Sequence, residues 1–333
     1  MKKVYNWAVL GCGRIARKFS NDLKLLENAN LYAAASREYE KAMDFAVECG
    51  FDKAYGSYEE MVNDPAVDVV YVATPHSFHH QHTLLCLNHK KAVLCEKAFA
   101  INLHEAEEMV ACAKKNDTFL MEAFWTMFQP SFKKAMEIIG SGELGNLKMV
   151  RSDFAFKGPY DPQRRLFNLA LGGGSLLDIG IYPVFAAITS LGKPDSIKTF
   201  AQFSPSGSEE SIAILFNYDQ GKMASLVSSF SSFSPVQTEY WCENGYLVLN
   251  TRWHAPTSIV VGKAGEPLLH IPSDHKEGHG YQYEAEHVMD CLDKNKIQSD
   301  TMPWQLSLDL METLDRIRKD ADIWFPHHDK INS

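Results

Sequence analysis

The stretch that decides the fold is "AVLGCGRIARKF" (residues 8–19), in which an apolar run ends in two closely spaced glycines. A G-x-G-x-x-A pattern between a strand and a helix is a dinucleotide-binding fingerprint, although a plain tight turn is the alternative. Gly11 permits the turn, Gly13 lets a pyrophosphate approach the backbone, and Ala16 allows close helix–strand packing. The free N–H groups of the helix start face the phosphates. The expected cofactor residues of this turn are Gly11, Gly13, Arg14, Ile15 and Ala16.

Strand-like and helix-like segments alternate through the first third of the chain. The expected strands cover residues 6–11, 31–36, 67–74, 92–96 and 118–122. They are continuous apolar runs, as in parallel sheets covered on both faces. Ser57 with Glu60, and Asn102 with Glu105, form capping boxes that start two of the intervening helices. This alternation predicts an α/β doubly wound parallel sheet over residues 1–122.

The pattern changes after Glu122. Helices are expected near 130–140, 175–191, 281–294 and 303–320, and strands at 196–204, 211–218, 222–230, 238–242, 246–251, 258–263 and 267–272. "ENGY" (243–246) predicts a hairpin, because Asn-Gly tolerates positive φ angles. Residues 123–333 therefore read as a second, α+β domain whose strands can pair antiparallel.

Composition excludes several classes of protein. The 333 residues carry a formal net charge of −9, and no dense Lys/Arg cluster provides a nucleic-acid footprint. Seven cysteines without a CxxC pair indicate reduced thiols. There is no signal-peptide pattern and no unbroken apolar run of about 18 residues. We expect a cytoplasmic protein that binds neither nucleic acid nor membrane.

The end of the second strand bears on cofactor choice. NAD-binding units usually have an acidic residue there, which binds the ribose 2′-OH. This chain has Ser36 and Arg37 instead, and Arg37 can pair bidentately with a 2′-phosphate. The pattern favours NADP, while the adjacent Glu38 leaves NAD possible and a solvated Arg37 is the plain alternative.

A second feature is "AVLCEKAFAIN" (92–102), a strand that ends in Glu96 and Lys97. Lysine is rarely buried unless it is paired. Ligands of open parallel sheets bind outside the carboxyl ends of the strands, where this pair lies. "LGGGSLLDIGIYPV" (171–184) offers partners, because Asp178 and Tyr182 are four apart on a helix and share a face. A kink is expected near Pro183. A structural Glu96–Lys97 pair is the alternative.

Five motifs together resemble the Gfo/Idh/MocA family of oxidoreductases over nearly the whole length. They are "VLGCGRIA" (9–16), "ATPHSFHHQH" (73–82), "CEKAFAIN" (95–102), "EAFWTMFQP" (122–130) and "GGGSLLDIGIYP" (172–183). The resemblance implies a Rossmann domain followed by a large, mostly antiparallel open sheet, often a dimerisation surface. It also implies oxidation or reduction of sugars, cyclitols or diols with a nicotinamide cofactor. A homodimer or higher oligomer through the second sheet is thus expected.

Two positions depart from the family's pattern. The Glu-Lys-Pro signature reads Glu96-Lys97-Ala98, and Tyr182 stands where many members carry histidine. The tyrosine resembles the branch of dimeric dihydrodiol dehydrogenase, glucose–fructose oxidoreductase and D-xylose dehydrogenase. In that branch the matching lysine and tyrosine are implicated in catalysis.

Chemistry supports these roles. A tyrosine has a pKa near 10, so it is a poor base at pH 7. A cation about 4 Å away favours phenolate by roughly 4 kcal/mol at an effective dielectric constant of about 20. We therefore expect Tyr182 to transfer the proton, Lys97 to tune it and bind the substrate oxygen, and Asp178 to orient the hydroxyl or Lys97.

The remaining candidates lie at other strand ends. The resemblance implies that Thr74-Pro75-His76, at the end of the third expected strand (67–74), lines the nicotinamide ribose. Trp125 either walls the pocket or is an ordinary core aromatic. Arg164 and Arg165 either bind a polar substrate or are solvated, and solvation is favoured. The histidines of "HSFHHQH" (76–82) lack a convincing third ligand, so no metal is expected. The further expected cofactor residues are Thr74, Pro75, His76, His79, Glu96, Lys97 and Trp125.

Three function classes follow from these residues. The leading one is an NAD(P)-dependent dehydrogenase or reductase acting on a sugar, cyclitol or trans-dihydrodiol. The second is a glycoside hydrolase that uses bound NAD as a transient oxidant, as some relatives do. The third is a non-catalytic redox sensor, which has no need for Lys97, Asp178 and Tyr182 together.

Overall fold

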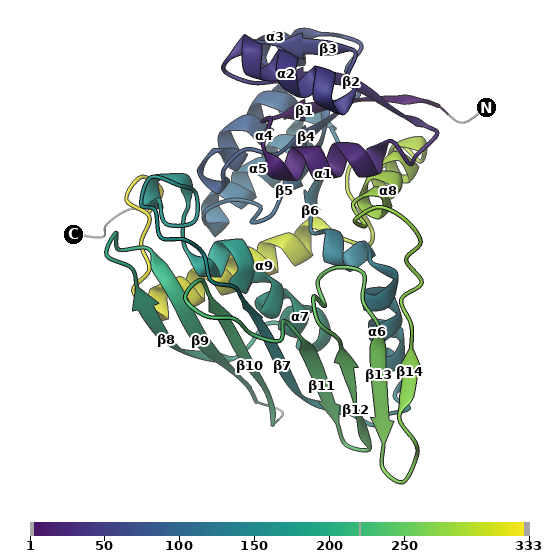
Figure 1. The fold of residues 1–333 in the computed structure, drawn as a ribbon, viewed down its shortest axis with the longest axis vertical. Coiled ribbons are helices and arrows are strands. Elements are labelled where there is room, and N and C mark those ends of the chain that lie inside the picture. Colours follow the sequence, from purple (N-terminus) through teal and green to yellow (C-terminus); the bar gives the residue numbers. More distant parts are fainter. Residues whose placement is uncertain (1–2, 220, 330–333) are drawn as a thin grey trace. The chain divides into compact units, whose positions relative to one another are not determined.

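The computed structural model describes residues 3–219 and 221–329, which form two compact units (Figure 1). The first unit comprises the chain up to Phe128 together with Lys276–Leu308. The second comprises Gln129–His275 and the chain from Asp309 onward. The division at residue 122 assigns Lys276–Leu308 to the second domain, whereas these residues pack with the first unit. A single domain boundary cannot describe this chain, because a later segment of it packs with the first unit.

The first unit contains a six-stranded parallel sheet in the order β3-β2-β1-β4-β5-β6. The strands are β1 (Tyr5–Leu10), β2 (Ala29–Ala35), β3 (Lys53–Tyr55), β4 (Val69–Val72), β5 (Ala92–Glu96) and β6 (Leu120–Ala123). Every strand residue of β4, β5 and β6 is buried, as the continuous apolar runs predict. The doubly wound sheet is confirmed. The short edge strand β3 was not expected, because three residues carry too weak a pattern.

Helices connect these strands. They are α1 (Arg14–Leu23), α2 (Tyr39–Cys49), α3 (Tyr58–Asn63), α4 (His79–Asn88) and α5 (Leu103–Asn116), with α8 (Gln282–Asp293) returning to contact α1. Both expected N-caps form, because Ser57 accepts from the Glu60 N–H at 3.1 Å and Asn102 from the Glu105 N–H at 2.9 Å. The order of the strands in the sheet changes direction between β1 and β4. Right-handed crossovers therefore place the helices of the two halves on opposite faces of the sheet.

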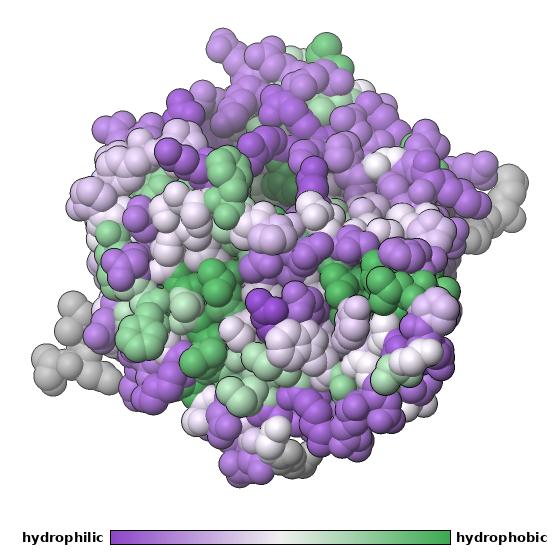
Figure 2. Space-filling model, turned by 60° about the horizontal axis from the view of Figure 1, so that its bottom comes forward, coloured by the Kyte–Doolittle hydropathy of each residue, from purple (hydrophilic) through white to green (hydrophobic). Residues whose placement is uncertain are grey.

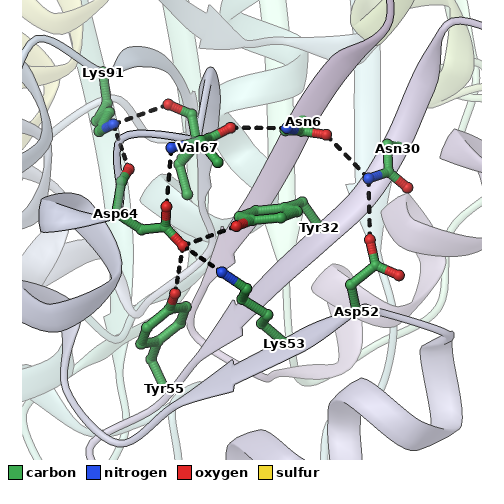
Figure 3. Close-up of polar contacts among 10 residues, drawn as sticks. Asn6, Asn30, Tyr32, Asp52, Lys53, Tyr55, Asp64, Val67 and Lys91 are labelled. Atoms are coloured by element: carbon green, nitrogen blue, oxygen red, sulfur yellow. Dashed lines mark hydrogen bonds and ion pairs between the residues drawn. The ribbon is translucent and has the colours of Figure 1, made fainter.

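A polar network holds the end of the sheet opposite to the carboxyl ends of the strands (Figure 3). The Asp64 carboxylate accepts from Tyr55 at 2.5 Å and from Tyr32 and Lys53 at 2.9 Å. The Tyr55 hydrogen bond is the largest of the effects that hold the pKa of Asp64 well below its usual range. The Lys91 ammonium donates to the backbone oxygens of Asp64 and Val67 at 2.6 and 3.0 Å. The network therefore fastens the loop before β4.

The second unit contains an eight-stranded sheet in the order β14-β13-β12-β11-β7-β10-β9-β8. The strands are β7 (Leu147–Ala155), β8 (Ser196–Phe203), β9 (Glu209–Tyr218), β10 (Lys222–Ser229), β11 (Thr238–Cys242), β12 (Gly245–Leu249), β13 (Ile259–Lys263) and β14 (Leu269–Ile271). All neighbours pair antiparallel except β7 and β10, which are parallel. The mostly antiparallel sheet is confirmed. Strand β7 at its centre was not expected, because Lys148 and Arg151 interrupt its apolar pattern.

Helices α6 (Pro130–Ser141), α7 (Ile181–Leu191) and α9 (Trp304–Asp320) complete the fold. The chain from Leu169 to Leu191 is long and apolar enough to cross a membrane by composition alone. Since 94% of its most apolar window is buried inside the structure, it has the environment of a core helix. Helix α6 contacts β12, and helix α7 contacts β7 and β10. The other sheet face is open, as exposed residues on β9 and β10 alternate with buried ones.

The predicted hairpin forms between β11 and β12, but its glycine has a different role from the expected one. Gly245 already belongs to β12 and is not among the residues with positive φ. A Cβ there would lie 2.4 Å from the carbonyl oxygen of Gly262 on β13. Glycine is thus needed for the close approach of a third strand, which the dipeptide itself cannot reveal.

Candidate active site

The glycine turn has the geometry that a phosphate cradle needs. Gly11 has a φ of +103°, and a Cβ there would lie 3.0 Å from both the Ala73 oxygen and Thr74 Cγ2. Gly13 is the N-cap of α1, and a Cβ there would meet only the Ala73 oxygen, at 3.9 Å. Gly11 is therefore required by the fold, whereas Gly13 leaves open space before the helix start. The turn fits a dinucleotide pyrophosphate.

The end of β2 presents a basic group beside this turn. Ser36 is buried, and its hydroxyl accepts from the Glu38 N–H at 3.4 Å. Arg37 is exposed. Burial raises the pKa of Tyr58, and the charge of Arg37 opposes this effect. Burial lowers the pKa of His82, and the charge of Arg37 acts in the same direction. Arg37 is thus exposed at the end of β2, as both the 2′-phosphate contact and the solvated alternative require.

The segment after β4 is tied to the segment after β5 through His79. This ring is fully buried, with Nε2 2.8 Å from the Thr74 oxygen and Nδ1 2.7 Å from the Ala98 oxygen. Burial lowers the pKa of His79 to about 4, while the two carbonyls act in the opposite direction. Both ring nitrogens thus face backbone groups of the first unit. His79 positions the loop that carries Lys97, and His76 packs edge-on against it with centroids 5.5 Å apart.

Glu96 and Lys97 lie at the carboxyl end of β5, as predicted. Glu96 is buried and accepts a very short hydrogen bond from the Tyr71 hydroxyl. Lys97 is only partly buried, and the peptide bond between Lys97 and Ala98 is cis. Trp125, after β6, is stacked on Tyr281 with centroids 4.3 Å apart. Tyr281 comes from the returning segment, so no local pattern identifies it.

Buried acids surround this end of the first unit, and sequence reasoning missed two of them. Burial raises the pKa of Glu122 to about 8, and this carboxyl accepts from the Phe99 N–H at 3.1 Å. Burial, reinforced by the charges of Glu96 and Asp22, raises the pKa of Glu284 well above its usual range. Among the described residues, neither Glu284 carboxyl oxygen has a hydrogen-bond partner. No group of three or more His, Cys, Asp or Glu side chains within the described ranges is placed to hold a metal ion.

In the second unit, Asp178 and Tyr182 follow the three glycines. Asp178 lies in a π-helical turn, Leu176–Gly180, which runs directly into α7. A kink was expected at Pro183, but Pro183 lies in the first turn of α7, where proline is tolerated, and the irregular turn precedes it. The prediction that Asp178 and Tyr182 share a helix face assumed a regular α-helix. Because Asp178 lies in a π-helical turn and Tyr182 in α7, that spacing argument does not apply to them directly.

A buried glutamate holds the start of this helical segment. Glu209, on β9, accepts from the Leu176 N–H at 3.0 and 3.1 Å and makes a very short hydrogen bond with Ser175. A Cβ on Gly174 would lie 2.7 Å from a Glu209 oxygen. Burial raises the pKa of Glu209 to about 8. The glycine loop therefore needs Gly174 so that Glu209 can cap the helix.

Two aromatic side chains and a histidine surround Tyr182. The rings of Phe154 and His254 stack at 4.4 Å, and each lies near Tyr182, with centroids 5.6 and 5.0 Å away. Trp253 meets Tyr182 edge-on at 6.4 Å. These residues come from β7 and from the loop after β12, so only the tertiary structure gathers them. Trp253 and His254 are buried, whereas Phe154 is partly exposed.

The structure gives Arg164 and Arg165 different ion-pair partners, whereas the sequence offered the same alternatives for both. Arg164 pairs with Asp161 at 3.1 Å, and its side chain is 81% exposed. Arg165 pairs with Asp178 at 2.5 Å. Arg165 is therefore paired as well as solvent-exposed, because the loop before the glycines folds back onto the helix that follows them.

Comparisons with known proteins agree with this architecture. Residues 5–124 match the oxidoreductase family with an NAD-binding Rossmann fold, and residues 132–248 match the GFO/IDH/MocA C-terminal domain. Trans-1,2-dihydrobenzene-1,2-diol dehydrogenase of Mus musculus is 36% identical over 96% of this chain and 98% of its own length. The Homo sapiens protein of that name is 35% identical with the same coverage.

Solved structures share the fold. An aldose-aldose oxidoreductase from Caulobacter crescentus has a TM-score of 0.87 at 24% identity, and a 3-ketoreductase from Actinomadura kijaniata has 0.86 at 22%. Each alignment covers 96% of this chain and 98% of the other. The chain therefore belongs to the Gfo/Idh/MocA family, as a nicotinamide-dependent dehydrogenase that acts on CH–OH groups.

Proposed function

We propose that this dehydrogenase uses NADP to oxidise a secondary hydroxyl of a cyclic diol, cyclitol or sugar, with trans-dihydrodiols as the favoured substrates. The observation that carries the proposal is the aromatic surround of Tyr182, formed by Phe154, Trp253 and His254. Phe154 is the partly exposed ring of this group, and its flat apolar face complements a cyclic diene better than an open-chain polyol. The names of the curated relatives point to the same class of substrate.

The proposed cofactor contacts follow the strand ends of the first unit. Gly11, Gly13 and the helix start after them would hold the pyrophosphate, and Arg37 would bind the 2′-phosphate with help from Ser36. The segment from Thr74 to His76 would line the nicotinamide ribose. When bound, the nicotinamide accepts the hydride.

The proposed proton transfer depends on Tyr182, Lys97 and Asp178. Tyr182, as a phenolate, takes the proton of the substrate hydroxyl while the carbon loses its hydride. The Lys97 ammonium stabilises the phenolate and binds the substrate oxygen. Asp178 accepts a hydrogen bond and orients the substrate.

Kinetics of four variants test these roles. Lys97→Met and Tyr182→Phe should each lower kcat by about 10²- to 10⁴-fold, the usual range for loss of an acid/base group, while both variants still bind the cofactor. Lys115→Met and Tyr160→Phe remove an exposed lysine and an exposed tyrosine and serve as matched controls. Near-normal turnover in either test variant would refute the assignment. Release of a glycoside leaving group without net NADPH formation would instead identify the hydrolase.

We also propose that two copies pair through the open face of the second sheet. Cross-strand register brings Met223, Met149, Trp241 and Tyr246 into one row across four strands. Three of these side chains are about 40% exposed, namely Met223, Trp241 and Tyr246. Figure 2 turns the bottom of Figure 1 forward and shows apolar patches there among polar residues. Such a row is typical of a surface that a partner covers.

Sedimentation tests this pairing. Trp241→Glu should convert a dimer into a monomer at micromolar concentration, because it places a charge in the centre of the row. Trp324→Glu alters a comparably exposed tryptophan outside the sheet and should leave the dimer intact. A wild-type protein that sediments as a monomer contradicts the proposal.

A further inference from the structure

The Arg165–Asp178 pair has a fixed place in the second unit. Arg165 Nη1 donates to Asp178 Oδ1 at 2.5 Å, and the Asp178 side chain is only 11% exposed. The Arg165 side chain is 41% exposed, so the pair lies at a surface rather than in the core. A buried carboxylate with a charged donor at its rim presents a donor and an acceptor side by side.

Backbone contacts hold the loop that delivers Arg165. The Gly174 N–H donates to the Leu166 oxygen at 3.0 Å, and the Gly173 N–H donates to the Asn168 oxygen at 2.9 Å. A Cβ on Gly173 would lie 2.9 Å from the Arg165 oxygen. The ring of Phe167 anchors the loop in a buried apolar cluster with Ile179 and Phe230. The position of Arg165 is therefore set by the same glycines that lead to Asp178 and Tyr182.

Vicinal diols match this arrangement. The hydroxyl that does not react has one hydrogen to donate and lone pairs to accept with. A carboxylate can only accept and a guanidinium can only donate, so the two together satisfy both roles of one hydroxyl.

We propose that Arg165 is a specificity-determining residue, which together with Asp178 binds the second, non-reacting hydroxyl of a vicinal diol. The proposal rests on the proposed function, because it places the substrate between this pair and Tyr182. It extends that function by assigning recognition of the neighbouring hydroxyl to a residue outside the helix that carries Asp178 and Tyr182.

The test compares trans-cyclohexane-1,2-diol with cyclohexanol, which lacks the second hydroxyl. The readout is kcat/KM for each alcohol with NADP⁺, followed by absorbance of the reduced nicotinamide. Arg165→Ala should lower kcat/KM for the diol by about 10- to 100-fold, the range expected for a charge-assisted hydrogen bond, and should leave that for cyclohexanol within about twofold. The preference for the diol should thus disappear. Arg165→Lys, which keeps the charge, should retain part of the preference.

Arg164→Ala is the matched control, because its side chain is exposed and pairs with Asp161 instead. It should retain the wild-type preference. An equal loss for both alcohols in Arg165→Ala, or an unchanged preference, overturns the proposal while the dehydrogenase function stands. Absence of diol turnover in the wild type overturns the proposed function, and this inference falls with it.

Discussion

Replacing Glu209 by glutamine tests whether this buried carboxyl is neutral at physiological pH. Three hydrogen bonds from Ser175 and Leu176 favour the ionised form, whereas burial favours the neutral one. Burial outweighs the hydrogen bonds and raises the pKa to about 8. Glutamine has the same shape and does not ionise. The variant Glu209→Gln therefore removes the titration and keeps the side-chain volume.

The magnitude follows from proton linkage. The unfolded chain loses this proton near pH 4.5, the usual value for the group, and the folded chain loses it near pH 8. A raised pKa in the folded state means that stability is highest at low pH, falls as pH rises above 4.5, and levels off above pH 8. Between pH 6 and pH 9 the wild type should lose about 2–3 kcal/mol through Glu209 alone.

Urea unfolding at pH 6 and pH 9 measures this loss. Glu209→Gln should show a pH dependence of unfolding free energy that is smaller than the wild-type one by about 2–3 kcal/mol. Glu210→Gln, the neighbouring and less buried position on β9, is the control and should behave like the wild type. An unchanged pH dependence in Glu209→Gln would show that the hydrogen bonds outweigh burial and that the carboxyl is ionised.

Three further predictions follow from the first unit. Arg37→Ala should weaken NADP⁺ binding at least about tenfold and leave NAD⁺ binding unchanged, because a charge-assisted pair with the 2′-phosphate is lost; equal effects on both cofactors, by fluorescence titration, would contradict that contact. Gly11→Ala should weaken cofactor binding by a similar factor, since its φ of +103° and the 3.0 Å approach to Ala73 leave no room for Cβ; an unchanged Kd would show that the turn adapts. Glu284→Gln should raise the urea midpoint at pH 9 relative to the wild type, because burial raises the pKa of Glu284 and ionisation then costs stability as pH increases; a lower midpoint at pH 9 would indicate an ionised, stabilising carboxylate.

Local signals in the sequence were sufficient for much of the first unit. Five of its six strands, the N-caps Ser57 and Asn102 and the Gly11 turn rest on interactions between residues close in the chain. Short-range geometry and apolar periodicity encode such features directly. The same holds for the hairpin between β11 and β12, although the reason for its glycine came from β13.

Features that join distant segments had no local signal. Strand β7 pairs with β10 and β11, which lie more than 70 positions further along the chain. Its charged residues interrupt the apolar pattern, so the sequence alone did not predict it. The stacking of Trp125 on Tyr281 and the capping of Leu176 by Glu209 likewise need the folded chain.

The chain alone thus determined the cofactor turn, the two kinds of sheet and the residues that carry the proposed chemistry. Only the tertiary structure decided which arginine pairs with Asp178, which rings surround Tyr182, and that Lys276–Leu308 return to the first unit. The reason is physical. Periodicity and turn chemistry depend on neighbours in sequence, whereas burial and ion pairing depend on what the rest of the fold brings near.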